Sequence, residues 1–565
     1  MRTHHKRTGK PYRISLLITL FFSTAVAAGE VPRPNILLLM AEDMSPRVAA
    51  FGDPIAFTPN LDQLAAEGVR FTNVFTASGV CAPSRAAQIT GMHPASVGGQ
   101  HMRASNRPAG GYKAVPPSDV KAYPELLRAA GYFTFTDDKI DYQFSAIRAG
   151  SGPFTIWDRE GGGANWSQRR AEQPFFGLIN FLQTHESGVF PPLTTRKLSG
   201  KYLNFQRFRA QHYGNPDEHQ FVTPEQVEVP PYFPDVATVR TDIARHYNNI
   251  ALMDRQVREI LDTLERDGLA DNTIVIWTSD HGDGLPRAKR EVFDSGIKVP
   301  MIIRWPARYR PAHLNPGQSE ERMISFVDLA PTILALAGVE APQYLPGQDF
   351  LDPSAAPRQY VFASRDRMDA VIDRQRAVRD QRYKYIRSWH PEQPGGHRLA
   401  YRDNMTMMQT LWQMLEDGQL NADQRRWFEP PGKEQLYDIQ ADPFELNNLV
   451  ESPEHQSTLN RMRAALAEWQ KHNRDWSEQS EAEMVAAFWP EGEQPITASP
   501  VFRGQSPQLT IQSETPGASL GYRINGGDWQ LYRGPIDVKP GDKIEARAIR
   551  YGWRESEPTS LQVAR

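Results

Sequence analysis

Short, continuous apolar runs alternate with amphipathic segments along this chain, and this alternation constrains the fold most strongly. Each apolar run has the length of a strand buried on both faces; the runs are residues 35–40, 174–182, 272–279 and 299–304. Helical patterns with start and stop signals accompany them, at residues 58–68, 241–264 and 328–337. This order predicts an α/β sandwich around a mostly parallel sheet, which we expect to occupy residues 31–387.

Composition and turn signals divide the remainder of the chain. Residues 388–490 are rich in Trp, Gln, Arg and Glu and contain helical patterns, which predict a smaller α+β subdomain. A stretch rich in Pro, Gly and Glu around residues 490–500 predicts a linker. Beyond it, turn signals such as Asn525-Gly526-Gly527 separate short alternating runs, so we expect a small β-sandwich over residues 500–565.

Residues 1–27 have the pattern of a secretory signal peptide. Basic residues precede an apolar core at residues 14–22, and Ala25-Val26-Ala27 fits a cleavage site. A signal anchor is the alternative, but the core is shorter than the roughly 20 residues that span a bilayer. No later segment is long and apolar enough to cross a membrane. We therefore expect a secreted or periplasmic protein.

The charge of the chain argues against nucleic acid as a partner. Loss of residues 1–27 removes five cations and no anions, which leaves 59 Lys and Arg against 67 Asp and Glu, a net charge of −8. Proteins that bind nucleic acid usually carry a basic footprint instead. An anionic substrate would need a local cationic pocket.

Two acidic pairs follow predicted buried strands. Glu42-Asp43 follows residues 35–40, and Asp280-His281 follows residues 272–279. Ligand sites lie at the carboxyl ends of parallel strands, and oxygen-rich ligand sets suit Ca²⁺ or Mg²⁺. Helix capping is the alternative role of such residues.

Cys81 is the only cysteine of the chain. A lone cysteine in an exported protein is either inert and buried or chemically special. The segment Cys81-Ala-Pro-Ser-Arg85, followed by Thr90-Gly91, resembles the C-x-P-S-R-x-x-x-x-T-G motif of the type I sulfatases. The resemblance extends from about residue 33 to 449 and includes Ser279-Asp280-His281-Gly282. It implies the fold of alkaline phosphatase, in agreement with the alternation of strands and helices.

The resemblance implies an unusual nucleophile. In that family a maturation enzyme converts the cysteine to Cα-formylglycine (3-oxoalanine) during export, so Cys81 would not remain a thiol. The hydrated aldehyde offers two hydroxyls, and a nearby cation lowers the pKa of one of them. Attack on sulfur releases the alcohol, and the second hydroxyl lets the aldehyde reform by expelling sulfate. A serine lacks that second hydroxyl.

The resemblance also assigns roles by position. The metal ligands would be Glu42, Asp43, Asp280 and His281 with an oxygen of residue 81, around Ca²⁺ or, as second choice, Mg²⁺. Arg85 would steady the modified side chain, and two lysines would hold sulfate oxygens as point charges; they are Lys139 and Lys289. His185 would protonate the leaving oxygen. His101 and Arg103 are candidate substrate contacts, with a solvated loop as the alternative.

Two positions depart from the family pattern. Glu42 stands where an aspartate is usual, which leaves the geometry and the choice of metal open. Asp141 stands where the family's K-x-H segment has histidine, so it is either the base that triggers sulfate expulsion or a substrate contact.

We expect an exported sulfatase that acts on a sulfated polysaccharide or oligosaccharide. Export, the many Arg and Trp residues and the terminal β unit favour such a substrate over a small aryl sulfate. The β unit, with Tyr522, Trp529 and Tyr532, resembles the C-terminal module of chitobiase-type glycosidases, and its role is glycan contact or domain packing. The alternatives are hydrolysis of N-sulfoglucosamine, hydrolysis of phosphonate or phosphate monoesters, and glycan binding by an inactive homologue.

Overall fold

A computed structural model describes Met1 and residues 32–104, 110–191, 200–212, 214–218 and 220–564. The chain divides into two units, Met1–Arg33 and Pro34–Arg565. Apart from Met1, the predicted signal peptide, residues 1–27, lies outside the described residues. Among the helices that are described, none has the length and apolar character needed to span a membrane.

A mainly parallel sheet forms the centre of the second unit. Its strands in the described part of the chain are β1 (Asn35–Ala41), β2 (Val69–Phe75), β3 (Phe133–Thr136), β4 (Arg159–Glu160), β5 (Phe175–Phe181), β6 (Thr273–Ser279), β7 (Lys298–Arg304), β8 (Ser319–Glu320) and β9 (Ile324–Ser325). The order is β4-β3-β5-β1-β6-β7-β2-β8, with β9 beside β2. Strands β4, β3, β5, β1 and β6 run parallel, whereas β7 is antiparallel to β6 and β2. The predicted α/β fold is confirmed.

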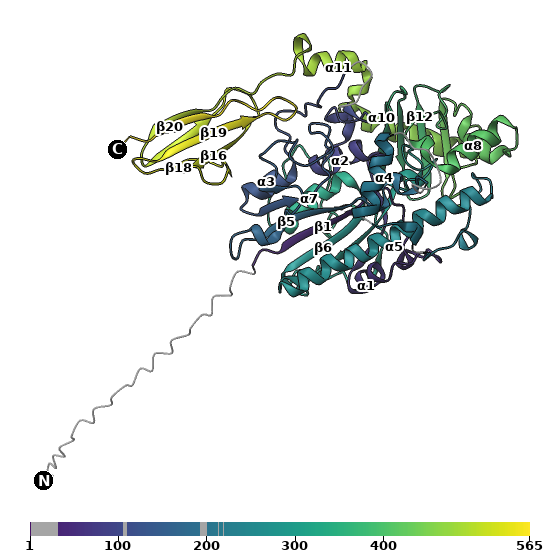
Figure 1. The fold of residues 1–565 in the computed structure, drawn as a ribbon, viewed down its shortest axis with the longest axis horizontal. Coiled ribbons are helices and arrows are strands. Elements are labelled where there is room, and N and C mark those ends of the chain that lie inside the picture. The colour runs from purple at the N-terminus through teal and green to yellow at the C-terminus, as the bar shows by residue number, and fades with distance from the viewer. Residues whose placement is uncertain (2–31, 105–109, 192–199, 213, 219, 565) are drawn as a thin grey trace. The chain divides into compact units, whose positions relative to one another are not determined.

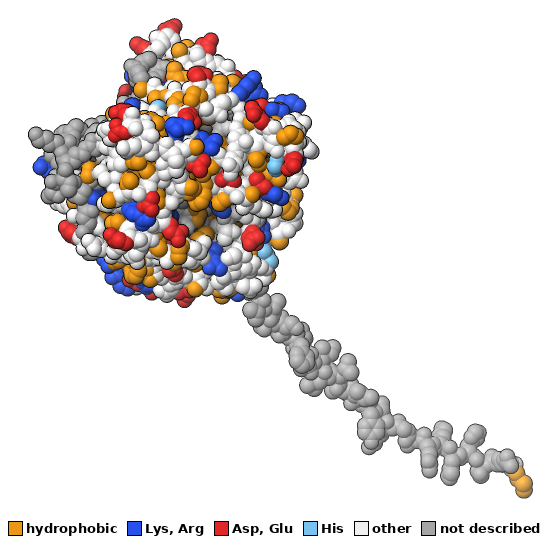
Figure 2. Space-filling model, turned by 90° about the vertical axis from the view of Figure 1, so that its right-hand side faces the viewer, with side chains coloured by type: hydrophobic (Ala, Val, Ile, Leu, Met, Phe, Trp, Pro, Cys, Tyr) orange, Lys and Arg blue, Asp and Glu red, His pale blue; other side chains and the backbone are white. Residues whose placement is uncertain are grey.

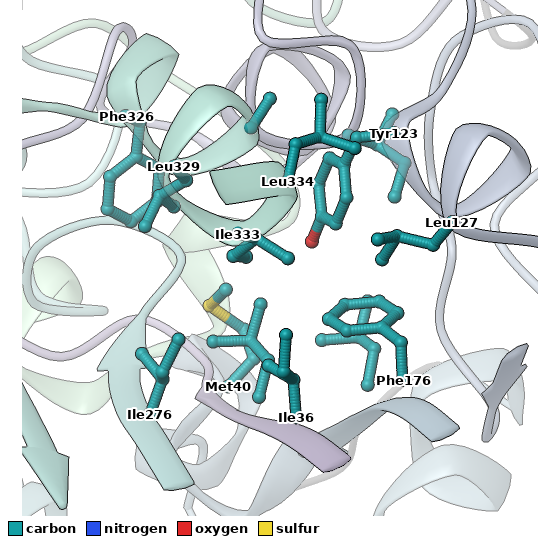
Figure 3. Packing of buried hydrophobic residues seen from close by; sticks show 14 of the residues in the cluster. Ile36, Met40, Tyr123, Leu127, Phe176, Ile276, Phe326, Leu329, Ile333 and Leu334 are labelled. Atoms are coloured by element: carbon teal, nitrogen blue, oxygen red, sulfur yellow. The ribbon is translucent and has the colours of Figure 1, made fainter. Parts of the chain in front are cut away.

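Helices cover both faces of this sheet (Figure 1). Alternate residues of the central strands point to opposite faces. Ile36 and Met40 of β1 pack with α3 (Tyr123–Ala129) and α7 (Leu329–Leu336), as Figure 3 shows. Leu37 and Leu39 point to the opposite face of the sheet, where they belong to a core cluster with residues of α1 (Pro59–Glu67) and α5 (Ala237–Arg266). All seven residues of β1 and all seven of β6 are buried, which explains their unbroken apolar sequences.

A second, antiparallel sheet follows. It contains β10 (Val361–Arg365), β11 (Gln375–Arg379), β12 (Tyr383–Ser388) and β13 (Glu434–Asp438) in that order. The predicted helical stretches correspond to α8 (Thr406–Glu416) and α10 (Gln456–His472). The predicted boundary between residues 387 and 388 falls at the end of β12, so this sheet draws strands from both predicted segments.

The C-terminal residues form a β-sandwich. One sheet contains β14 (Val501–Gln505), β15 (Gln508–Gln512) and β18 (Ile536–Asp537). The other contains β16 (Ser519–Ile524), β17 (Gln530–Leu531), β19 (Lys543–Ile549) and β20 (Thr559–Gln562). Leu509, Ile511 and Ile544 lie in the shared core.

A buried carboxylate joins this sandwich to the main domain. Glu125 of α3 accepts hydrogen bonds from Ser519 Oγ (2.5 Å) and Tyr551 Oη (2.7 Å) of the sandwich, and from Thr155 Oγ1 (2.5 Å). The ring of Tyr551 is fully buried and stacks on Phe144, with centroids 5.0 Å apart. Because hydrogen bonds to charged groups are strong, these contacts fix the sandwich in place.

We predict that Tyr551→Phe lowers the free energy of unfolding by about 1–3 kcal/mol, because one donor to Glu125 is lost while the ring stacking is kept. Urea unfolding followed by fluorescence measures the change. Tyr522→Phe is the matched control, since its hydroxyl bonds Gln530 at the exposed surface and its loss should cost less than about 0.5 kcal/mol. Equal effects of the two substitutions would contradict the role of Glu125.

Candidate active site

The carboxyl ends of β1 and β6 bring the two acidic pairs together. Ala41 and Ser279 are register partners at the ends of these parallel strands, so the residues after them are neighbours. The backbone N–H of Asp43 donates to Asp280 Oδ1 at 2.9 Å. The four side chains are buried, with exposed fractions between 0 and 1%; they are Glu42, Asp43, Asp280 and His281. Asp43 has a left-handed backbone (φ 47°), a conformation that Asp enters more readily than most residues.

Cys81 faces this cluster from the first turn of α2 (Cys81–Thr90). Its Sγ lies 3.3 Å from His281 Nε2, 3.6 Å from Asp43 Oδ1 and 4.0 Å from Glu42 Oε2. The side chain is fully buried. Sγ therefore belongs to the same buried cluster as these three side chains.

The donor set fits a divalent cation. The ligand atoms of Asp43, Cys81, Asp280 and His281 all lie within 4.8 Å of one another, and so do those of Glu42, Asp43, Cys81 and His185. His281 Nδ1 lies 2.9 Å from the carbonyl oxygen of Gly282, so this nitrogen donates and Nε2 is the atom that faces the cluster, 2.9 Å from Asp43 Oδ1. Three carboxylates with one imidazole suit Ca²⁺ or Mg²⁺ better than Zn²⁺.

Three cations balance the buried carboxylates. Arg85 pairs with Glu42 and, through Nε at 3.2 Å, with Asp280 Oδ2. Lys139 pairs with the other oxygen of Glu42. Lys289 Nζ lies 2.5 Å from Asp43 Oδ2. The sequence analysis named the same three residues for this site.

The charges shift the proton affinities of the cluster. Burial by itself would raise the pKa of Asp43, but the charge of Lys289 holds that pKa well below its usual range. Burial by itself would lower the pKa of His281, but Asp280 and Asp43 raise it well above its usual range. A cation or a proton on His281 therefore serves the same electrostatic need.

His185 lies beside Lys289. Its Nε2 is 3.5 Å from Lys289 Nζ, and its Nδ1 is 2.9 Å from Ser187 Oγ. Burial and the charge of Lys289 hold the pKa of His185 well below its usual range, so the imidazole is neutral at pH 7. An anionic sulfate group bound here would raise that pKa toward the protonated form that a proton donor needs.

Asp141 forms an ion pair with Arg103. The guanidinium contacts the carboxylate through Nε (3.1 Å) and Nη2 (2.8 Å). Burial would raise the pKa of Asp141, but Arg103 lowers it to about 2. Asp141, like Asp43, has a left-handed backbone (φ 55°). The side chain of Arg103 is 21% exposed and borders solvent.

His101 lies apart from the ligand cluster. Its Nδ1 accepts a hydrogen bond from the backbone N–H of Arg367 at 3.3 Å, and the side chain is buried. Burial lowers its pKa, so it is a neutral residue of a packed loop. Arg103 therefore contacts a predicted site residue, Asp141, whereas the described side-chain contact of His101 is with the backbone of Arg367.

The sequence predictions did not include three residues of the site. Asn180, at the end of β5, accepts from Arg85 Nη1 at 2.7 Å. Glu186 follows His185, lies 3.4 Å from Lys289 and pairs with Arg290 at 2.7 Å. Asn180 lies near the end of a predicted strand, and Glu186 and Arg290 each follow a predicted catalytic residue directly; these positions were the signal that could have indicated them.

Comparison with known proteins agrees with this geometry. The family profile described as "Sulfatase" matches residues 34–339, and the profile described as "N-sulphoglucosamine sulphohydrolase, C-terminal" matches residues 287–396. An "Ulvan-active sulfatase" of Formosa agariphila is 39% identical over 557 residues, covering 94% of this chain and 92% of that protein. Human N-sulphoglucosamine sulphohydrolase is 26% identical over 483 residues, covering 78% and 90%.

A solved structure agrees in fold. That of a 2-O GAG sulfatase aligns with a TM-score of 0.55 at 19% identity, covering 80% of this chain and 96% of that one. One family profile covers more than half of the chain, and a relative is 39% identical over nearly all of it. The chain therefore belongs to the sulfatase family of the alkaline phosphatase superfamily and is a sulfuric ester hydrolase.

Proposed function

We propose that this chain is an exported sulfatase that hydrolyses sulfate esters of a sulfated polysaccharide, with ulvan as the first candidate. The observation that carries the proposal is the 39% identity to an ulvan-active sulfatase over 94% of the chain. The signal-peptide pattern of residues 1–27 supports export.

We propose further that a maturation enzyme converts Cys81 to formylglycine. The motif Cys81–Arg85 supports this, and so does the burial of the side chain among carboxylates, where a thiol has no structural partner to form a disulfide. A hydrated formylglycine would supply the nucleophilic hydroxyl. Arg85 lies one helical turn after residue 81 and would stabilise the charge on that hydroxyl.

The remaining roles follow from the charges around residue 81. Glu42, Asp43, Asp280 and His281 would hold a divalent cation, whose charge lowers the pKa of an oxygen bound to it. Ca²⁺ is the first choice because the ligands are mainly carboxylate oxygens; elemental analysis showing another metal would overturn it. Lys139 and Lys289 would bind sulfate oxygens, and His185 would give a proton to the leaving oxygen.

The contacts of Asp141 favour substrate binding over base catalysis. A carboxylate with a pKa of about 2 is a weak base at neutral pH. Its bidentate pair with Arg103 instead holds a partly exposed guanidinium beside the site. We propose that Asp141 positions Arg103 for an anionic or hydroxyl group of the sugar.

A panel of substrates tests the proposed function. We predict sulfate release from ulvan by the matured enzyme, measured by ion chromatography. N-sulfated glucosamine, a phosphonate monoester and an aryl sulfate are the comparison substrates, because they represent the alternative activities. Faster turnover of the N-sulfated sugar or of the phosphonate would replace the proposal by that alternative. Binding of ulvan without any sulfate release would indicate an inactive homologue.

For Asp141, we predict that Asp141→Asn and Arg103→Gln each raise the KM for ulvan about tenfold, as loss of a contact worth about 1.4 kcal/mol does. The double variant should add little to either, because the two residues act as a pair. Turnover of a small aryl sulfate should change little.

Rapid-quench kinetics on an aryl sulfate distinguishes the alternative. If Asp141 is the base that expels sulfate, Asp141→Asn gives a burst of alcohol close to one equivalent and then slow turnover. That result, or additive effects of the two substitutions, would contradict the positioning role.

A further inference from the structure

A groove of about 670 Å³ lies where the C-terminal β-sandwich meets the main domain. Its lining, which we call the seam groove, includes Arg159, Arg523, Arg547, Phe154, Asp528 and Trp529. We propose that the seam groove is a second binding site for sulfated polysaccharide, separate from the active site. This inference rests on the proposed function for the identity of the polymer.

The arginines of the groove can accept an anionic ligand at low cost. The side chains of Arg159, Arg523 and Arg547 are 41%, 34% and 24% exposed. Their ion-pair partners are themselves at least partly exposed; they are Asp528 (81%), Glu545 (17%) and Glu555 (37%). Because exposed ion pairs contribute little, a sulfate or carboxylate can share or replace these partners.

Aromatic rings hold two of these guanidinium groups in place. Arg547 lies between Phe154 of the main domain, 3.8 Å from the ring centroid, and Trp529 of the sandwich, at 4.2 Å. Arg523 lies 4.9 Å from the same Trp529 ring. Cation–π contacts of this kind restrict the arginines before a ligand arrives, so binding loses less side-chain entropy. The rings serve to orient cations rather than to stack on sugars.

The groove has a fixed shape because the sandwich is docked closely. Gly517 has a left-handed backbone (φ +70°), and a Cβ there would lie 2.1 Å from the carbonyl oxygen of Ser118 in the main domain. Arg128 Nη2 donates across the junction to the carbonyl oxygen of Trp529 at 3.2 Å. Together with the contacts of Glu125, these interactions keep both sides of the groove in register.

The groove and the active site lie on the same central sheet, at different levels along its strands. Arg159 and Glu160 form β4, which pairs in parallel with the last two residues of β3. The carboxyl ends of β4, β3, β5 and β1 therefore point the same way. From β4 to β1 is three strand spacings, about 14 Å. Through the register of β3 and β5, Arg159 is level with Leu37 of β1, so the active-site carboxylates that begin at Glu42 lie a further distance of about 17 Å along the strands. A polysaccharide of several sugar units spans such a distance, so one chain can occupy both sites and gain from a high effective concentration.

A local site is needed because the protein offers no general attraction for a polyanion. The net charge of the full chain is −3. On the face shown in Figure 2, basic and acidic side chains are interspersed rather than gathered by sign. Specific cations at the seam groove therefore provide what the overall charge does not.

The test compares two double variants of the full-length enzyme. Arg159→Gln with Arg523→Gln removes two groove cations. Arg461→Gln with Arg463→Gln removes two cations of similar exposure (43% and 41%) that pair with Asp380 and Glu434 outside the groove lining. Native gels containing ulvan report binding without any need for turnover. Neutral dextran and dextran sulfate are the control polymers, and melting curves check that both variants fold.

We expect the groove variant to bind ulvan about three- to tenfold more weakly, and its KM for ulvan to rise by a similar factor. Turnover of a small aryl sulfate should stay unchanged, and the control variant should match the unsubstituted enzyme. Equal affinities for ulvan in all three proteins would overturn the proposal. An equal loss of ulvan binding in both double variants would also overturn it, because that result means general attraction of a polyanion. Equal retention of all three proteins by dextran sulfate and by ulvan would overturn it for the same reason. A further outcome separates the two proposals: the groove variant loses ulvan binding, but the unsubstituted enzyme releases no sulfate from ulvan. That result would overturn the proposed function and support the seam groove as a binding site.

Discussion

The structure depends on the burial of three carboxylates at one edge of the central sheet. Glu42, Asp43 and Asp280 are each no more than 1% exposed. Removing a carboxylate from water is costly unless positive charge compensates it. The fold brings that charge from three places: Arg85 on α2, Lys139 after β3 and Lys289 after β6. Replacing buried ion pairs by apolar residues is often neutral or stabilising in proteins, so this arrangement is better explained by chemistry than by stability.

The parallel pairing of β1 with β6 sets the position of everything else in the site. Because their carboxyl ends coincide, the two acidic pairs converge, and Cys81 at the start of α2 lies within 4.0 Å of three members of the cluster. The start of a helix also favours negative charge, which suits an oxyanion at residue 81. The same edge of the sheet continues through β5, which precedes His185, and through β3, which precedes Lys139 and Asp141. The proposed polymer site lies on the same sheet, beside β4, three strands away from β1.

The sequence predicted the parts of this arrangement that depend on local pattern. The central strands could be predicted because a strand buried on both faces has an unbroken apolar sequence. The acidic pairs could then be placed because they directly follow these strands. Strand β2 was not predicted, since its sequence Val-Arg-Phe-Thr-Asn-Val-Phe mixes polar residues into a partly buried strand, and β3 has only four residues. The pairing of Asp141 with Arg103 and of Glu186 with Arg290 depends on tertiary contacts between distant segments, which no local spacing encodes. The seam groove likewise exists only once the sandwich is docked.

The central claim is that residue 81 is the nucleophile in a modified form. Peptide mass spectrometry of the protein purified from its own host tests it most directly. Conversion of the CH₂SH side chain to CHO predicts a peptide about 18 Da lighter at residue 81. Cys81→Ser, prepared in the same way, should keep the fold but lose turnover unless the host also converts serine. An active preparation in which residue 81 is entirely a free thiol would contradict the account.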